Sequence, residues 1–236
     1  MIDAFLIHGI GKRGSSAKSF TDITQGIFKH LPNNTDVNIR SIDYSALLDK
    51  RETEILEWVK SMSGPFDLLA KYEREFIAYY ICDVLAYAYP KRKLRKGDFM
   101  YDLQELLARE MSTARKGAKT MIIGHSLGSI VGYGATWDVH TDCLVTMGSP
   151  FSWFSIRYAD GGEMNPDLPE FHNFWSSRDR VSTIVSKNPK FRCVHDYKVE
   201  TWNPFMITRL ARHGVYFTSS FVHKSIANIM KKLEAK

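Results

Sequence analysis

A serine between two glycines gives the strongest chemical signal in this sequence: Ser126 lies in the segment GHSLG, between Gly124 and Gly128. An apolar run at residues 119–123 precedes this segment, and apolar residues at helical spacing follow it over residues 127–137. A strand, a sharp turn and a helix in this order are typical of a nucleophile elbow, which projects a serine hydroxyl above a sheet. Side chains at the two glycine positions would then collide with the neighbouring strand and helix. A serine that only caps a helix is the alternative.

A second glycine turn, HGIG, follows the apolar run of residues 2–7. The tetrahedral intermediate of acyl transfer carries a negative oxygen, which needs hydrogen-bond donors already in place. We expect one donor to be the backbone amide of Leu127, directly after the serine, and the other to be the amide of Ile10. Gly9 and Gly11 flank Ile10 and would let its backbone approach a ligand closely. A glycine turn without chemistry is the alternative.

Taken together, HGIG and GHSLG resemble the signature turns of the α/β-hydrolase superfamily. More narrowly, they are similar to those of small bacterial lipases and of GPI-inositol-deacylase-like serine esterases. The resemblance extends over nearly the whole chain in the order of its elements, although its specific motifs are short. It implies a catalytic triad whose members follow one another along the chain as serine, carboxylate and histidine.

The carboxylate of such a triad is expected after a strand that follows the serine. The predicted strand at residues 143–147 runs into Gly-Ser-Pro, with no carboxylate nearby. The next predicted strand, residues 171–175, runs into SSRDRV, which resembles the superfamily's acid turn and makes Asp179 the predicted acid. Asp167 and Glu170 precede this strand and would lie at the wrong end of the sheet. A helix cap or an ion-pair partner is the alternative role of Asp179.

The base is expected on a loop before the last helix, where HGVY resembles the superfamily's H-x-x-Y turn. His213, the first residue of that turn, is therefore the predicted base. His8 and His125 flank the oxyanion turn and the elbow, and we interpret them as residues that shape the site. Three rival histidines lie inside predicted strands or the last helix: His172, His195 and His223.

These turns need a scaffold, and the hydrophobic pattern predicts one. Strands are expected at residues 2–7, 37–42, 119–123, 143–147, 171–175 and 193–199, and helices at 17–31, 99–114, 127–137 and the carboxyl terminus. The alternation indicates an α/β fold with a mainly parallel sheet of about six strands and helices on both faces. Ligands of such sheets bind beyond the carboxyl ends of the strands. We expect a single domain over residues 1–236.

Residues 50–96 exceed what a short connection between a strand and a helix requires, and we interpret them as a helical lid or cap. Residues 76–89, FIAYYICDVLAYAY, are too short to span a bilayer, and a basic run follows them at residues 91–96. Three interpretations stay open. The apolar segment is buried between lid and core, or it forms a wall for an acyl chain. Otherwise residues 76–96 make a weak peripheral contact with an anionic membrane.

The pattern predicts a serine hydrolase that cleaves carboxylic esters through an acyl-enzyme, with a small-molecule or lipid ester as substrate. This scheme requires neither a metal ion nor an organic cofactor. A thioesterase or an acyltransferase would use the same residues, and a non-catalytic binding protein on a hydrolase fold is an alternative of another class. The net charge of +6 permits an anionic partner, but the basic run lacks a recognised nucleic-acid motif, so no nucleic-acid partner is expected.

The three cysteines, Cys82, Cys143 and Cys193, are too far apart in the sequence for a metal or redox motif. Their apolar neighbours predict buried free thiols. The amino-terminal segment MIDAFLIHGIGK has no basic region followed by a long apolar stretch, so it does not resemble a signal peptide. A reducing cytoplasmic location is the expectation.

Overall fold

The computed structural model describes residues 1–8, 15–44, 99–152, 164–179, 181–200 and 213–236. The chain divides into two compact units, one made of Met1–Ile42 and Glu110–Lys236 and the other of Asp43–Arg109. In the second unit the described part consists of Asp43, Tyr44 and most of helix α4 (Phe99–Met111). The predicted lid at residues 50–96 lies outside the described residues.

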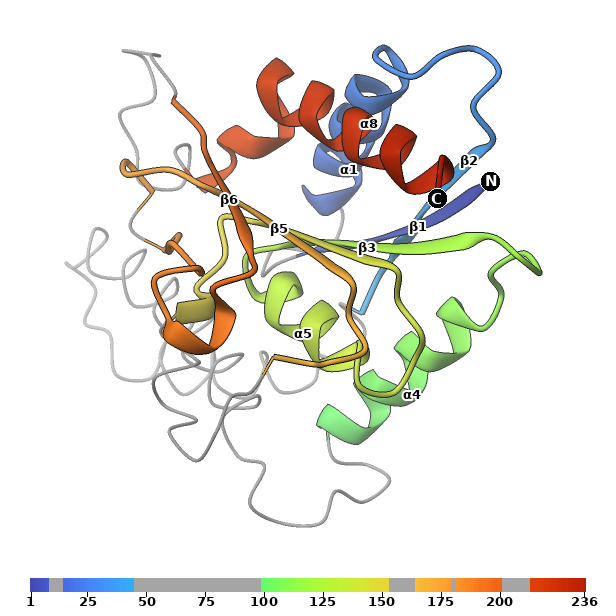
Figure 1. Ribbon diagram of the computed structural model, residues 1–236, viewed down its shortest axis with the longest axis horizontal. Helices are drawn as coiled ribbons and strands as arrows, with labels where there is room; N and C mark the ends of the chain where they lie inside the picture. The colour runs from blue at the N-terminus through green and yellow to red at the C-terminus, as the bar shows by residue number, and fades with distance from the viewer. Residues whose placement is uncertain (9–14, 45–98, 153–163, 180, 201–212) are drawn as a thin grey trace, which may run out of the picture. The chain divides into compact units, whose positions relative to one another are not determined.

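Six parallel strands form one sheet in the first unit, in the order β2-β1-β3-β4-β5-β6 (Figure 1). Their bounds are β1 (Ile2–Ile7), β2 (Val37–Ile42), β3 (Lys119–His125), β4 (Cys143–Met147), β5 (Glu170–Trp175) and β6 (His195–Lys198). Strands β1 and β4 are buried along their whole length, as expected for parallel strands covered on both faces. The predicted parallel α/β sheet is therefore confirmed.

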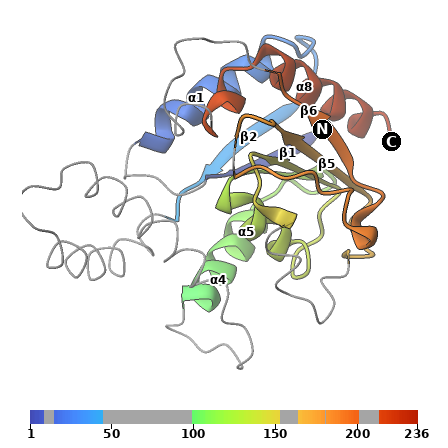
Figure 2. The ribbon, with the colours of Figure 1, turned by 90° about the vertical axis from the view of Figure 1, so that its left-hand side faces the viewer.

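Helices cover both faces of this sheet. Helices α1 (Ser15–Phe28) and α8 (Ser220–Glu234) lie side by side on one face, and α5 (Leu127–Ala135) lies on the other (Figures 1 and 2). Two single-turn 3₁₀ helices, η1 (Pro189–Phe191) and η2 (Val215–Phe217), lie in the loops before β6 and α8. The core under α1 and α8 is built from apolar residues of both helices and of the strands: Ile23, Ile27, Met121, Val145, Phe174, Ile226 and Met230.

Two details differ from the sequence-based expectations. The last strand begins at His195 and not at residue 193, because Val194 closes a turn by donating its N–H to the carbonyl of Phe191 at 3.1 Å. This turn leaves Cys193 exposed, so the prediction that it is a buried thiol was wrong, whereas Cys143 is buried as expected. Cys82 lies outside the described residues.

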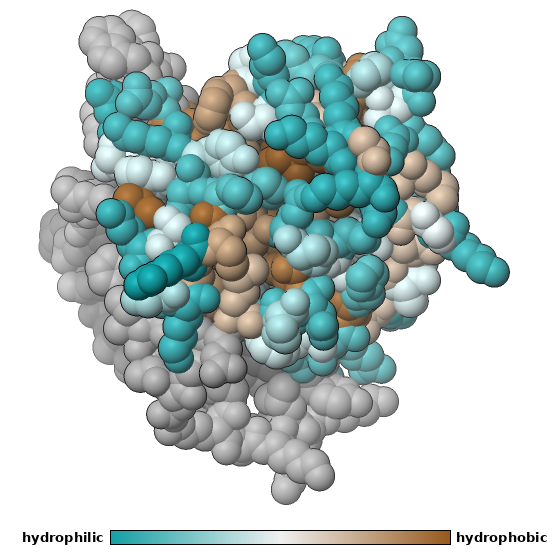
Figure 3. Space-filling model, in the orientation of Figure 1, coloured by the Kyte–Doolittle hydropathy of each residue, from teal (hydrophilic) through white to brown (hydrophobic). Residues whose placement is uncertain are grey.

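One face of the molecule shows how polar and apolar residues are distributed at the surface. On the face shown in Figure 3, hydrophobic residues appear in small groups among hydrophilic ones. Among the described residues, three large apolar side chains are exposed, Phe28, Trp137 and Phe221, and they belong to different segments of the chain. Among the helices of the described part, none has both the length and the apolar character needed to cross a membrane.

Candidate active site

Ser126 occupies the turn between β3 and α5 in an unusual backbone conformation. Its φ is 54° and its ψ is −125°, and it is the one non-glycine residue with positive φ in the described part of the chain. Such a conformation costs on the order of 1–3 kcal/mol and persists only where the surroundings enforce it. The serine side chain makes no capping hydrogen bond to the helix. The alternative interpretation of Ser126 as an ordinary helix cap is therefore wrong.

The two glycines of the elbow have the steric role expected from the sequence. A Cβ atom on Gly124 would lie 2.5 Å from the carbonyl oxygen of Gly128, in the first turn of α5. A Cβ atom on Gly128 would lie 2.3 Å from the carbonyl oxygen of His8, just after β1. Both contacts are with backbone, which cannot move aside. The tight turn therefore depends on glycine at both positions.

Asp179 and His213 meet at the carboxyl edge of the sheet although they are 34 residues apart. Nδ1–H of His213 donates to Oδ2 of Asp179 at 2.8 Å. The same oxygen accepts the hydroxyl of Tyr216 at 2.9 Å, and Oδ1 accepts the N–H of Val181 at 3.0 Å. The pairing fixes the imidazole with its second nitrogen, Nε2, as the free position for proton transfer.

The pKa of Asp179 lies below its ordinary value. Burial alone would raise this pKa, because it disfavours the charged carboxylate. The hydrogen bond and charge of His213 outweigh burial, and the donors Val181 and Tyr216 add to their effect. Asp179 is thus a carboxylate at neutral pH, able to stabilise a positive charge on the ring of His213.

Nε2 of His213 is buried and has no hydrogen-bond partner among the described residues. The Ser126 hydroxyl and this nitrogen do not hydrogen-bond to each other in the structure. The neighbouring residue His125 nevertheless links the elbow to His213, because its Nε2–H donates to the carbonyl of His213 at 3.0 Å. The Ser126 N–H donates to the carbonyl of Met147 at 2.9 Å. A catalytic hydrogen bond such as the one between a serine hydroxyl and a histidine often tightens only when substrate is bound.

Gly148, which follows β4, lies against the acid and the histidine. Its φ is 58°, and an added Cβ would lie 2.8 Å from the Tyr216 ring, 3.1 Å from Cε1 of His213 and 3.2 Å from Oδ2 of Asp179. A larger residue would push the pair apart. The sequence alone gives a usable signal for this glycine, because it directly follows a strand that borders the elbow strand. For Tyr216 the signal in the sequence is its place in the HGVY turn.

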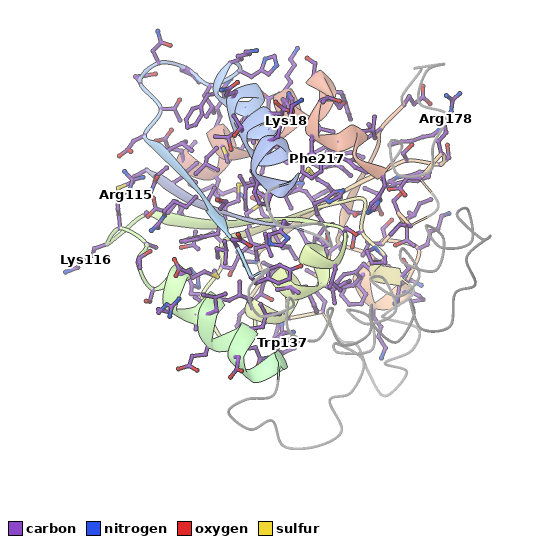
Figure 4. The ribbon with its side chains drawn as sticks, turned by 180° about the vertical axis from the view of Figure 1, so that it is seen from behind. Lys18, Arg115, Lys116, Trp137, Arg178 and Phe217 are labelled. Atoms are coloured by element: carbon purple, nitrogen blue, oxygen red, sulfur yellow. The ribbon has the colours of Figure 1, made fainter. Side chains whose placement is uncertain are left out.

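His125 packs between the site and the core. Its ring centroid lies 4.7 Å from that of His213 and 4.4 Å from that of Phe217, which Figure 4 labels near α1. Burial, together with the charge of His213, lowers the pKa of His125 to about 3. The ring is therefore neutral, and its proton on Nε2 is used to hold the backbone of His213. This agrees with the interpretation of His125 as a shaping residue.

The lowered pKa of His125 predicts a pH-dependent stability. In the unfolded chain the ring has a pKa of about 6.5, so between roughly pH 6.5 and 3 the unfolded state binds the proton and the folded state does not. The free energy of unfolding therefore falls as pH falls through this window, by at most about 5 kcal/mol. We expect denaturant unfolding at a series of pH values to give a shallower pH dependence for His125→Gln than for the wild type.

Burial also lowers the pKa values of His172 and His223. Because the wild type and the His125→Gln variant both keep these two residues, the difference between the two proteins reports on the ring of His125 alone. His8 and Asp179 also act on the ring of His125, and they too are unchanged in the variant. Two parallel curves of unfolding free energy against pH would show that His125 does not titrate as expected.

A buried polar network holds the loop that carries Asp179. Thr146 of β4 donates its hydroxyl to Oδ1 of Asn173 in β5 at 2.8 Å, and Nδ2 of Asn173 donates to Asp196 of β6 at 2.6 Å. The side chains of Asn173 and Asp196 then bind backbone groups of the loop: the carbonyl of Thr183 and the N–H groups of Val185 and Ser186. Three neighbouring strands thus fix the loop from below, while Arg178 on its outer side points away from the sheet (Figure 4).

One of the two predicted oxyanion donors lies within the described residues. Leu127 is the first residue of α5, so its N–H has no acceptor inside the helix and is directed toward the turn. Ile10, Gly9 and Gly11 lie outside the described residues, and the second predicted donor stays a prediction. His8, the last described residue before them, is buried next to Phe20 of α1.

The rival residues lie elsewhere. His223 is buried in α8, where its Nε2 binds the carbonyl of Phe217 at 2.8 Å and its ring packs on Gly26 of α1. His172 and Glu170 are at the start of β5, at the opposite edge of the sheet from Ser126.

Comparisons with known proteins identify the fold. No protein-family model and no curated protein matches the sequence. A crystal structure of a Xanthomonas campestris protein assigned to the α/β superfamily of hydrolases matches 97% of this chain and 99% of its own, with a TM-score of 0.52 and 14% identity. The crystal structure of ClbQ, from the colibactin NRPS/PKS pathway, covers 95% of this chain and 98% of its own, with a TM-score of 0.41 and 12% identity. The chain has the α/β-hydrolase fold.

Proposed function

We propose that this protein is a serine hydrolase that cleaves carboxylic esters, with Ser126 as nucleophile, His213 as general base and Asp179 as the acid of the triad. The observation that carries the proposal is the buried Nε2 of His213. This atom has no partner among the described residues, while Nδ1 of the same ring is fixed by a carboxylate. A buried nitrogen without a partner is costly unless it receives a proton from a substrate or nucleophile.

The reaction follows from these positions. His213 takes the proton of the Ser126 hydroxyl as Oγ attacks the ester carbonyl, and Asp179 stabilises the imidazolium that forms. The N–H of Leu127, with that of Ile10 as the second donor, receives the negative oxygen of the tetrahedral intermediate. The imidazolium then gives its proton to the leaving alkoxide, and the acyl group stays on Ser126. Water releases it through the same steps in reverse.

The backbone strain at Ser126 supports a nucleophile more than a structural serine. A serine without a catalytic role could be replaced there by glycine, which adopts positive φ without cost. Retention of a side chain at this strained position is expected where the hydroxyl itself is needed. The proposal for substrate is a small-molecule or lipid ester, in the manner of lipases and esterases. A panel of p-nitrophenyl esters of increasing acyl length, with matched thioesters, separates this activity from a thioesterase.

Covalent labelling tests the nucleophile directly. We expect a fluorophosphonate probe to form a phosphonate ester with Oγ of Ser126, because the probe's phosphorus imitates the tetrahedral intermediate. Mass spectrometry of the digested protein would locate the adduct on the peptide that contains residue 126, and heat-denatured protein should remain unlabelled. Absence of an adduct, or an adduct on another serine, would favour a non-catalytic binding protein or a different site.

A further inference from the structure

A second group of chemically reactive side chains lies at the amino-terminal edge of the sheet, opposite the candidate active site. Cys143 begins β4 and Glu170 begins β5, and the two residues are directly paired in the parallel register. His172 lies two residues further along β5 and therefore on the same face as Glu170. One ligating atom from each of the three residues lies within 4.8 Å of the other two.

The orientation of His172 is fixed by two hydrogen bonds. Its Nε2 lies 3.1 Å from Oε2 of Glu170, and its Nδ1 lies 3.1 Å from the hydroxyl of Tyr197 in β6. A carboxylate only accepts hydrogen bonds, so Nε2 carries the proton and the tyrosine hydroxyl donates to Nδ1. If Nε2 were bound to a cation instead, the proton would lie on Nδ1 and would be donated to Tyr197. Such a second partner for a metal-bound histidine is a regular feature of metal sites.

We propose that Cys143, Glu170 and His172 form a binding site for a divalent transition-metal ion, with Zn²⁺ as the best match. Zn²⁺ binds thiolate, imidazole and carboxylate ligands in tetrahedral geometry. Bond lengths of roughly 2.0–2.1 Å to nitrogen and 2.0–2.2 Å to oxygen place two such ligands about 3.3 Å apart. The 3.1 Å separation between His172 and Glu170 is close to this value. The fourth position is left for water or another exogenous ligand.

The charges of the site fit a divalent cation. A thiolate at Cys143 and a carboxylate at Glu170 carry two negative charges, and a neutral His172 adds none, so a 2+ ion would be neutralised. Glu170 is paired at present with the ammonium group of Lys236. The Lys236 side chain is 61% exposed, so it can turn into solvent when a cation takes its place. The ring of the exposed His195 stacks on His172, with the centroids 5.1 Å apart.

The register between strands β4 and β5 explains why the sequence alone does not reveal the group of Cys143, Glu170 and His172. Cys143 lies 27 residues before Glu170 along the chain, so no short ligand motif exists, and only the register of β4 against β5 brings the side chains together. Both strands belong to a rigid sheet, which favours a site with little reorganisation. A bound ion would cross-link two strands beneath the carboxyl-terminal part of α8, and we expect it to raise the melting temperature.

Cobalt titration tests the site without reference to catalysis. The full-length protein is first dialysed against a chelator and then titrated with Co²⁺. The expected result is a thiolate-to-cobalt charge-transfer band together with the intense visible bands of tetrahedral Co²⁺, both removed by one equivalent of Zn²⁺. Zn²⁺ should also raise the melting temperature of the metal-free protein, since an ion that binds only the folded state stabilises it.

Matched variants locate the bands. The double variant Cys82→Ser/Cys193→Ser keeps Cys143 as the sole thiol and should retain the charge-transfer band, whereas Cys143→Ser should lose it.

Tyr197→Phe should weaken the affinity for Co²⁺ by about 10-fold, as expected for a residue that supports a ligand. Lys236→Met should strengthen it, because the competing ammonium is gone. His172→Gln, which leaves the thiol in the core, provides a second test if Cys143→Ser does not fold.

The proposal would be overturned if the wild type showed no charge-transfer band, or if the band persisted in Cys143→Ser or in a folded His172→Gln variant. Loss of the band in Cys82→Ser/Cys193→Ser would equally overturn it, since another thiol would then be the ligand. None of these outcomes depends on ester hydrolysis, which takes place at the other edge of the sheet in the proposed function.

Discussion

Ser126→Ala is expected to remove nearly all hydrolysis of p-nitrophenyl esters, with kcat reduced on the order of 10⁵- to 10⁶-fold. The side chain makes no capping hydrogen bond to α5, so its removal takes away the proposed nucleophile and little else. The fluorophosphonate adduct should disappear in the same variant. Steady-state kinetics of the purified proteins, with circular dichroism spectra to verify folding, provide the measurement.

Two further serine variants sharpen this test. Ser186→Ala, on the loop that follows β5, changes a serine outside the elbow and should leave kcat within a few-fold of the wild type. Ser126→Gly should be as inactive as Ser126→Ala but more stable, since glycine tolerates a φ of 54°. Relief of about 1–3 kcal/mol of backbone strain would raise the melting temperature by several degrees. Retained turnover in a folded Ser126→Ala protein would end the proposal that this residue is the nucleophile.

Asp179→Asn is expected to lower kcat by roughly 10⁴-fold while preserving the fold. The amide has nearly the shape of the carboxylate, but it can donate a hydrogen bond to Nδ1 of His213 and so favours the wrong tautomer of the ring. It also lacks the negative charge that stabilises the imidazolium. Esterase kinetics should therefore show a loss in kcat with little change in KM, since the substrate does not contact Asp179 in the proposed mechanism.

Tyr216→Phe is the matched control for this variant. It removes one donor to the same carboxylate oxygen, at 2.9 Å, but keeps both the charge and the bond to His213. We expect a reduction of kcat by no more than about 100-fold, because a single hydrogen bond to a charged group contributes about 1.5–3 kcal/mol. A Tyr216→Phe protein as inactive as Asp179→Asn would mean that the tyrosine hydroxyl has a larger part in the reaction than the proposed mechanism gives it.

The parts of this molecule that could be predicted from sequence are those encoded locally. Apolar runs gave the strands, and a serine between glycines after such a run gave the elbow, because its steric requirement leaves few residue choices. Asp179 and His213 could be proposed as acid and base because each lies in a turn that resembles one of the superfamily's turns. Their 2.8 Å hydrogen bond is a tertiary property, but it follows once the turns are placed at one edge of a parallel sheet.

The features that escaped prediction depend on contacts between distant segments. Gly148 lies in an ordinary Gly-Ser-Pro sequence, and only the packing of Tyr216 and His213 above it shows why a side chain is not tolerated. The neutral state of His125 results from burial that no local pattern encodes. The exposure of Cys193 had a similar origin, because a turn that closes at Val194 displaced the start of β6.

The polar network beneath the loop that carries Asp179 has a consequence for engineering. Asn173 and Asp196 hold the loop through backbone groups of residues 183–186, and the exposed Ser177 lies outside that anchorage. Saturation mutagenesis at this exposed position would diversify the rim beside the carboxylate without disturbing its placement. Selectivity could thus be evolved there separately from reactivity, whereas randomising the strand residues below would sacrifice both.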